Sequence, residues 1–334
     1  MKVKVNGEEK DVRTVWWEDE KVAMIDQPKL PFEFAIKQFS TYKETADAIT
    51  NMIVRGAPAI GATAAFATAQ AFQAEEDMQK AAEYIKAARP TAIDLKHGVD
   101  RILKVGKDNA VEEAEIVSQE YIDKCSKLGD YGNELIKDGD KILTHCNAGW
   151  LACVEWGSAT APIYKAKQAG KNVFVWIDET RPRCQGARLT AWEMEQEGVE
   201  HAVIVDNAAG YYMKKGEVNL CITGADRVAR NGDVANKIGT YEKAVVAKAN
   251  NIPFYVAIPS NTYNHNCENG DVIPIEERDE EEVTHMWSNT GKFRIANPNS
   301  KARNPAFDVT PAEFITGYIT EKGVLKADEL EKLK

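Results

Sequence analysis

The sequence lacks several features that would assign it to a common class of protein. No apolar run approaches the 18 residues of a membrane-spanning helix. The first ten residues contain no apolar stretch suited to a signal peptide. There are six cysteines but no Cys-x-x-Cys pair. We therefore expect a cytoplasmic protein with no membrane partner, whose cysteines remain reduced thiols rather than forming a disulfide framework.

Motifs for the common cofactors are also missing. No Gly-x-Gly-x-x-Gly follows a predicted strand, which leaves a dinucleotide cofactor without support. Residues 55–63 (RGAPAIGAT) resemble a nucleotide phosphate loop, but Ala62 replaces its lysine and no buried strand precedes it. His265 and Cys267 form a His-x-Cys with no second ligand pair at zinc spacing. We expect neither a metal nor an organic cofactor.

The chain has fewer positive than negative charges. Lys and Arg total 42 and Asp and Glu total 52, so the formal net charge is 42 − 52 = −10. An acidic chain is a poor binder of nucleic-acid backbones, so nucleic acid is not expected as the main ligand. A local basic pocket for one small phosphate remains compatible with this charge.

The 334 residues suggest about two domains, and we place them at residues 1–130 and 131–334. In the first, residues 2–5, 12–17 and 22–25 alternate like strands, with turns at Asn6-Gly7 and at 18–20. Residues 27–32 form a connector. Residues 41–128 are rich in Ala, Glu, Lys, Gln and Met, which indicates helices.

The second unit alternates apolar runs with helical segments. The runs 141–145, 172–177, 202–205, 220–223 and 253–258 lack polar alternation, as strands buried on both faces do. Helices are expected at 151–168, 187–196, 241–250 and 311–320, with a polar, loop-rich segment at 264–308. The fold class is therefore α/β: a small N-terminal sheet-plus-helices domain, then a doubly wound parallel sheet.

Ligands of such sheets bind outside the carboxyl ends of the strands. Cys146 follows the first apolar run, where we expect a helix N-terminus to lower its thiol pKa. The alternative is a small buried hydrophobe. Asp226 follows the fourth run and is either an acid whose pKa is raised in a closed apolar site or an N-cap or partner of Arg227.

Two cations are candidates for binding a phosphate. Arg55 precedes small residues that open a helix, an arrangement that suits one phosphate through charge and free N–H groups. Lys237 lies just before a predicted helix and either holds a phosphate or is a surface lysine.

Seven blocks, in order along the chain, resemble the methylthioribose-1-phosphate isomerase family. They are residues 55–61 (RGAPAIG), 89–92 (RPTA), 144–149 (THCNAG), 179–182 with 185–192 (ETRP, QGARLTAW), 224–227 (GADR), 231–240 (NGDVANKIGT) and 304–311 (NPAFDVTP). The wider superfamily also contains ribose-1,5-bisphosphate isomerases and non-catalytic regulatory subunits of a translation-initiation exchange factor.

The resemblance implies an aldose–ketose isomerase of methionine salvage, with a Rossmann-like second domain and a homodimeric assembly. Its substrate would be 5-methylthioribose 1-phosphate or a closely related 5-deoxy or 5-substituted ribose 1-phosphate. Matched by motif, Cys146 and Asp226 would be catalytic. The implied substrate contacts are Arg55, Gly56, Ala57, Arg89, Gln185, Asn236 and Lys237.

Alternatives remain open on the residues alone. They are a bisphosphate isomerase, which would want extra cations near the sugar C5, a non-catalytic regulatory subunit, and a sugar-phosphate binding module. Trp150, where many family members carry a smaller residue, either caps the pocket or packs in the core. Cys184 also departs from the usual apolar choice.

Overall fold

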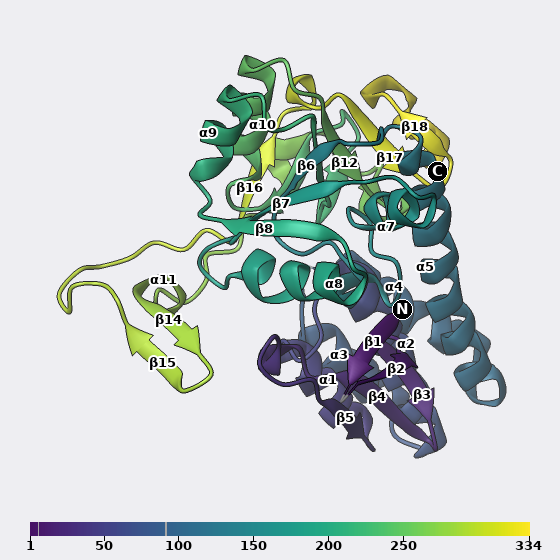
Figure 1. The fold of residues 1–334 in the computed structure, drawn as a ribbon. Helices are drawn as coiled ribbons and strands as arrows, with labels where there is room; N and C mark the ends of the chain where they lie inside the picture. The colour runs from purple at the N-terminus through teal and green to yellow at the C-terminus, as the bar shows by residue number, and fades with distance from the viewer. Residues whose placement is uncertain (6, 91) are drawn as a thin grey trace.

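The computed structural model describes residues 1–5, 7–90 and 92–334. Asn6, half of the predicted Asn6-Gly7 turn, and Thr91, within the 89–92 block, lie outside the described residues. Figure 1 shows a lower part built from the N-terminal strands and helices, an upper part built around one large sheet, and an arm that projects from the body.

The N-terminal strands form two small antiparallel sheets. β1 (Lys2–Val5) pairs with β2 (Glu8–Asp11), and β3 (Val15–Glu18), β4 (Lys21–Ile25) and β5 (Ile36–Phe39) form the other. The predicted strands at 2–5 and 22–25 are confirmed. The predicted strand at 12–17 begins only at Val15, because Val12 bonds back to Met1 through its main chain.

The expected helical region is confirmed, and its described residues form five α-helices. They are α1 (Tyr42–Thr50), α2 (Ala57–Gln73), α3 (Met78–Ala87), α4 (Ile93–Val105) and α5 (Ala110–Asn133). The boundary predicted at residue 130 falls inside α5, which packs against α2 on one side and against α7 and β17 on the other. The division into two domains stays a prediction.

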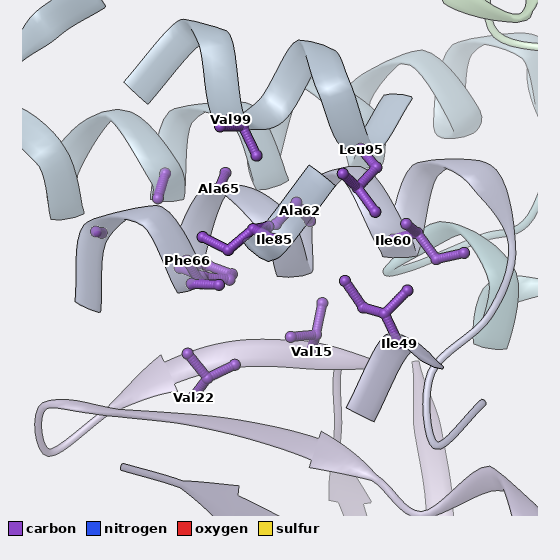
Figure 2. Packing of buried hydrophobic residues seen from close by; sticks show 14 of the residues in the cluster. Val15, Val22, Ile49, Ile60, Ala62, Ala65, Phe66, Ile85, Leu95 and Val99 are labelled. Atoms are coloured by element: carbon purple, nitrogen blue, oxygen red, sulfur yellow. The ribbon is translucent and has the colours of Figure 1, made fainter. Parts of the chain in front are cut away.

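Helix α2 is the centre of the lower core. All its residues from Pro58 to Ala71 are buried, and half of them are alanine, so neighbouring helices approach closely. Figure 2 shows Ala62, Ala65 and Phe66 of α2 among side chains of the other helices and of the β3–β4 hairpin. A Cβ added at Gly98 of α4 would lie 2.4 Å from the Gly61 carbonyl oxygen, so only glycine fits where α2 and α4 cross.

The large sheet has the strand order β18-β17-β12-β9-β6-β7-β8, and every neighbouring pair is parallel except β17 with β18. Ile142 and Ile222 face one buried cluster while Leu143 and Cys221 face another, so the central strands are covered on both sides, as predicted. The strands are β6 (Lys141–Thr144), β7 (Phe174–Asp178), β8 (Glu200–Ile204), β9 (Leu220–Thr223), β12 (Phe254–Ala257), β17 (Gly317–Thr320) and β18 (Gly323–Leu325).

Short helices connect these strands. They are α6 (Trp150–Cys153), α7 (Ala161–Gln168), a π-helical turn η3 (Gly186–Thr190) running into α8 (Ala191–Gln196), α9 (Ala208–Lys214) and α10 (Thr240–Ala249). The helix expected over 151–168 is interrupted between α6 and α7. Val154, Trp156 and Gly157 there have positive φ angles, which a helix cannot contain.

The C-terminal third adds a second sheet and the arm. β10 (Arg227–Ala229), β11 (Val234–Lys237), β13 (Tyr263–Asn264) and β16 (Phe307–Thr310) form the sheet, and α11 (Glu281–Thr284), β14 (His285–Ser288) and β15 (Gly291–Arg294) form the arm. The helix predicted over 311–320 is wrong. Gly317-Tyr-Ile-Thr320 is the buried strand β17, because its aromatic and β-branched side chains fill the sheet beside β12.

Among the described residues, no helix has both the length and the apolar character needed to cross a bilayer.

The close contact between Gly61 of α2 and Gly98 of α4 predicts that replacing Gly98 by alanine destabilises the fold. Gly98→Ala should lower the free energy of unfolding by about 1–3 kcal/mol, because the added methyl meets backbone rather than a flexible side chain. Urea unfolding measures it. Gly210→Ala in α9 is the matched control, since its Cβ would meet only a Val246 methyl at 3.3 Å. Equal stability of both variants would contradict the packing argument.

Candidate active site

The reversal of strand order in the large sheet creates a crevice. From β6 the chain proceeds to β7 and β8 on one side, then returns to β9, β12 and β17 on the other. Loops leaving the carboxyl ends of β6 and β9 therefore diverge, and ligands bind at such a point. A cavity of about 150 Å³, partly open to solvent, lies here, between these loops and the N-terminal helices.

All nine predicted site residues line this cavity. They are Arg55, Gly56, Ala57, Arg89, Cys146, Gln185, Asp226, Asn236 and Lys237. They come from segments up to 182 positions apart (Arg55 to Lys237, 237 − 55), which the fold brings to one place. Trp150 does not line it. Its side chain is fully buried beside Trp192, 5.7 Å between ring centres, so the core interpretation is correct.

Cys146 is held in a strained backbone conformation. Its φ is +65°, in the left-handed region that non-glycine residues rarely occupy. Thr180 Oγ1 accepts the Cys146 N–H at 2.8 Å, and Thr190 Oγ1 donates to the Cys146 carbonyl at 2.7 Å. Two threonine hydroxyls from the β7–α8 segment thus fix the turn that presents the thiol.

The expected lowering of the Cys146 pKa by a following helix is wrong. Helix α6 begins only at Trp150 and has four residues. Burial instead raises the pKa of the thiol, and the charges of Arg55 and Lys237 and the N–H of Asn147 oppose that rise. The thiolate depends on cations supplied by two other segments.

Arg55 joins the N-terminal helices to the loop after β6. Its Nη1 and Nη2 donate to the Asn147 carbonyl at 3.0 and 2.8 Å, and Nη2 also donates to Asn147 Oδ1. Its Nε has no hydrogen-bond partner among the described residues. Burial lowers the pKa of the guanidinium, while the charges of Cys146, Glu193 and Asp226 raise it.

Asp226 directly precedes β10 and Lys237 ends β11, and these two strands pair in the four-stranded sheet. The Asp226 N–H donates to the Ala235 carbonyl at 3.0 Å, beside Asn236. The Asp226 side chain is exposed to the cavity, so the closed apolar setting expected for it is absent here. Lys237 donates to the Ala306 carbonyl at 2.9 Å, and burial lowers its pKa, so it is not a surface lysine.

Three further arginines line the cavity, Arg183, Arg227 and Arg278, and the sequence analysis named only Arg227, as a partner of Asp226. Arg183 Nη1 donates to Glu282 Oε1 at 3.0 Å, and Arg278 donates to both Glu282 oxygens at 2.6 and 2.9 Å. These bonds lower the pKa of Glu282 to about 2 despite its burial. Arg183 lies between the 179–182 and 185–192 blocks, so its position in the sequence could have marked it as a candidate site residue. No sequence feature predicts that Arg183 forms an ion pair with Glu282 of the arm.

A second buried charge cluster lies behind Cys146. His145 Nδ1 lies 2.9 Å from Asp178 Oδ2 and Nε2 lies 2.8 Å from the Ile238 carbonyl oxygen. Lys243 Nζ is 3.7 Å from Asp178 Oδ2. His145, Asp178 and Asp206 are close enough to one another to hold a metal. However, both imidazole nitrogens already face protein oxygens and Lys243 supplies a cation, so these residues do not fit a metal ion.

The dependence of the thiolate on Arg55 is testable. Arg55→Gln should slow alkylation of Cys146 by iodoacetamide at pH 8 by about 3–10-fold, because losing the nearby charge raises the thiol pKa further and each pKa unit is tenfold. Mass spectrometry of the Cys146 peptide measures the rate. Arg303→Gln, an exposed arginine outside the cavity, is the control. Equal rates in both variants would contradict the electrostatic account.

Comparisons with known proteins agree with this architecture. The model of the initiation factor 2 subunit family matches residues 53–327. Methylthioribose-1-phosphate isomerase of Geobacter metallireducens is 46% identical over 344 aligned positions, covering 96% of this chain and 98% of that protein. The Thermotoga neapolitana protein of the same name is 48% identical, covering 96% and 97%.

Two solved structures are similar over nearly the whole chain. One is 5-methylthioribose 1-phosphate isomerase of Pyrococcus horikoshii, with a TM-score of 0.90, 41% identity and coverage of 97% of this chain and 96% of that one. The other is described as translation initiation factor eIF-2B subunit delta of A. fulgidus, with a TM-score of 0.85, 40% identity and coverage of 97% and 99%. On the family model and the full-length relatives, the chain belongs to the initiation factor 2 subunit family and, within it, to the methylthioribose-1-phosphate isomerases.

Proposed function

We propose that the chain converts 5-methylthioribose 1-phosphate to 5-methylthioribulose 1-phosphate in methionine salvage. The observation that carries this proposal is the cavity at the strand-order reversal. It combines a thiol and a carboxylate, Cys146 and Asp226, with the cations Arg55, Arg89 and Lys237. A scaffold or a purely binding protein has no need of that acid–base pair.

The cations provide the phosphate subsite. Arg55, Arg89 and Lys237 supply charge, and the N-terminus of α2 at Gly56 and Ala57 supplies main-chain N–H groups. A Cβ at Gly56 would lie 2.5 Å from the Ala152 Cβ, so glycine is required for this backbone approach. Gln185 and Asn236 then contribute hydrogen bonds to the sugar.

The reaction needs an acid first. Because the phosphate occupies the anomeric oxygen, the sugar cannot open to a free aldehyde. We assign to Asp226 the proton that the ring oxygen takes up as its bond to C1 breaks. The cationic carbon at C1 is then stabilised by its phosphate-bearing oxygen.

Hydrogen must next move from C2 to C1. The Cys146 thiolate removes the C2 proton to form an enol, then returns a proton to C1, while the C2 hydroxyl gives its proton to the Asp226 carboxylate. The protons balance, and Asp226 ends as it began. A direct hydride shift from C2 to C1 is the other route, and it leaves the C1 hydrogen out of exchange with solvent.

The cavity favours an apolar group on C5 over a second phosphate. Arg183 and Arg278, two of the additional cavity arginines that a second phosphate could use, are both paired with Glu282. Apolar side chains line much of the remaining wall, namely Met52, Ile60, Ile93, Ile273, Pro274 and Phe307. The experiment is a panel of three ribose phosphates with ketose formation as the readout, and activity only on the bisphosphate would overturn the proposal.

We also propose that the protein is a cytoplasmic homodimer, as the family resemblance implies. The arm exposes Trp287 and Phe293, each about half accessible, on a ribbon that stands away from the body. Mass determination in solution tests the assembly.

Replacement of either reacting side chain should remove most activity. Cys146→Ser and Asp226→Asn should each lower kcat/KM by about 10²–10⁴-fold, the usual contribution of general acid–base catalysis. Circular dichroism checks that both variants fold. Cys184→Ser, a half-buried thiol outside the cavity lining, is the control and should keep normal turnover. Near-normal turnover of both site variants would refute the assignment.

A further inference from the structure

Asn147, the residue after Cys146, uses every polar group of its side chain. Its Oδ1 and main-chain carbonyl accept from the Arg55 guanidinium, the latter at 2.8 and 3.0 Å. Its Nδ2 donates to Glu193 Oε1 at 2.9 Å and to Thr190 Oγ1 at 3.1 Å. Because the side chain is only 4% exposed, both ends of the amide are fixed by protein groups.

Glu193 of α8 is the anchor behind Asn147. Its carboxylate is fully buried and also accepts from the N–H groups of Trp150 and Leu151, at 3.0 and 3.1 Å, and from the Tyr164 hydroxyl at 2.8 Å. Any side chain at Gly149 would overlap it, since a Cβ there would lie 1.8 Å from Glu193 Oε2. Asn147, Trp150 and Leu151 in this turn therefore all donate hydrogen bonds to the Glu193 carboxylate.

The same contacts restrict Arg55. Two of its nitrogens are tied to Asn147, and Nε, buried and without a partner among the described residues, is left as a donor for a ligand oxygen. An arginine held in place before binding loses little conformational freedom when an anion arrives. Since Asn147 directly follows Cys146, the bonds that place Arg55 also set its distance from the thiol.

We propose that Glu193 and Asn147 are positioning residues, which hold the Arg55 guanidinium ready for the substrate's phosphate group and in register with Cys146. This inference rests on the proposed function, in which Arg55 binds that phosphate. Neither residue touches the reacting atoms. Their effect reaches the anion through Arg55.

The test uses sulfate, a tetrahedral dianion, as a competitive inhibitor of the purified enzyme. Asn147→Ala should raise the sulfate inhibition constant by about tenfold and raise KM more than it lowers kcat, because the guanidinium loses its side-chain acceptor. Tyr164→Phe is the matched control. It removes one bond to Glu193 that leads away from Arg55, so it should leave the sulfate constant within about twofold.

Two substitutions of Glu193 separate positioning from packing. Glu193→Gln retains an oxygen that can accept from the Asn147 amide, so it should keep near-normal sulfate affinity. Glu193→Leu cannot accept and should behave like Asn147→Ala. If Glu193→Leu fails to fold, Asn147→Ala decides alone. Unchanged sulfate affinity in a folded Asn147→Ala variant, or an equal loss in Tyr164→Phe, would overturn the inference.

Arg55→Gln distinguishes failure of this inference from failure of the proposed function. If Arg55→Gln leaves sulfate inhibition unchanged, Arg55 does not bind the anion and its proposed role is wrong. If Arg55→Gln weakens sulfate but Asn147→Ala does not, Arg55 binds the anion without this support and only the positioning role is wrong.

Discussion

In the large sheet the chain leaves β6 in one direction and returns to β9 in the other, and the cavity that holds the proposed reacting groups depends on that reversal. Main-chain bonds join β6 to β9 along the strands, so the loops beyond them must separate. Cys146 lies in the loop after β6, and Asp226 lies in the loop after β9. The cavity exists because no connection crosses between these two strand ends, and the N-terminal helices close it from a third side.

How much of this can be predicted depends on whether a residue acts locally or through distant partners. The apolar runs of β6, β7, β9 and β12 are local signals, and their predicted limits agree within two residues. Motif spacing marks Cys146, Asp226, Arg55 and Lys237, which the fold brings to one cavity, while their roles stay predictions. The helix prediction over 311–320 fails at Gly317-Tyr-Ile-Thr320 because the conformation of this segment is decided by its pairing with β12, which is distant in the sequence.

The polar residues that support the site could not be predicted from the sequence, for a related reason. Glu193 lies 46 positions from Asn147, Asn147 lies 92 from Arg55, and Glu282 lies 99 from Arg183. A buried carboxylate is costly unless its lone pairs are filled, and only the folded chain brings four donors to Glu193. Such residues look unremarkable in sequence, yet they fix the geometry of those that motifs identify.

The cation-lined cavity sits in a protein that is strongly acidic overall. A dianionic ligand far from the surface meets the field of a chain with a formal charge of −10, and it meets attraction only once it is near Arg55, Arg89 and Lys237. Charges beyond a screening length of about 10 Å in 0.1 M salt contribute little. Moderate ionic strength therefore screens the distant repulsion before it weakens the short-range attraction. The association rate of the ligand should then be highest at an intermediate salt concentration, rather than fall steadily from its value in pure water.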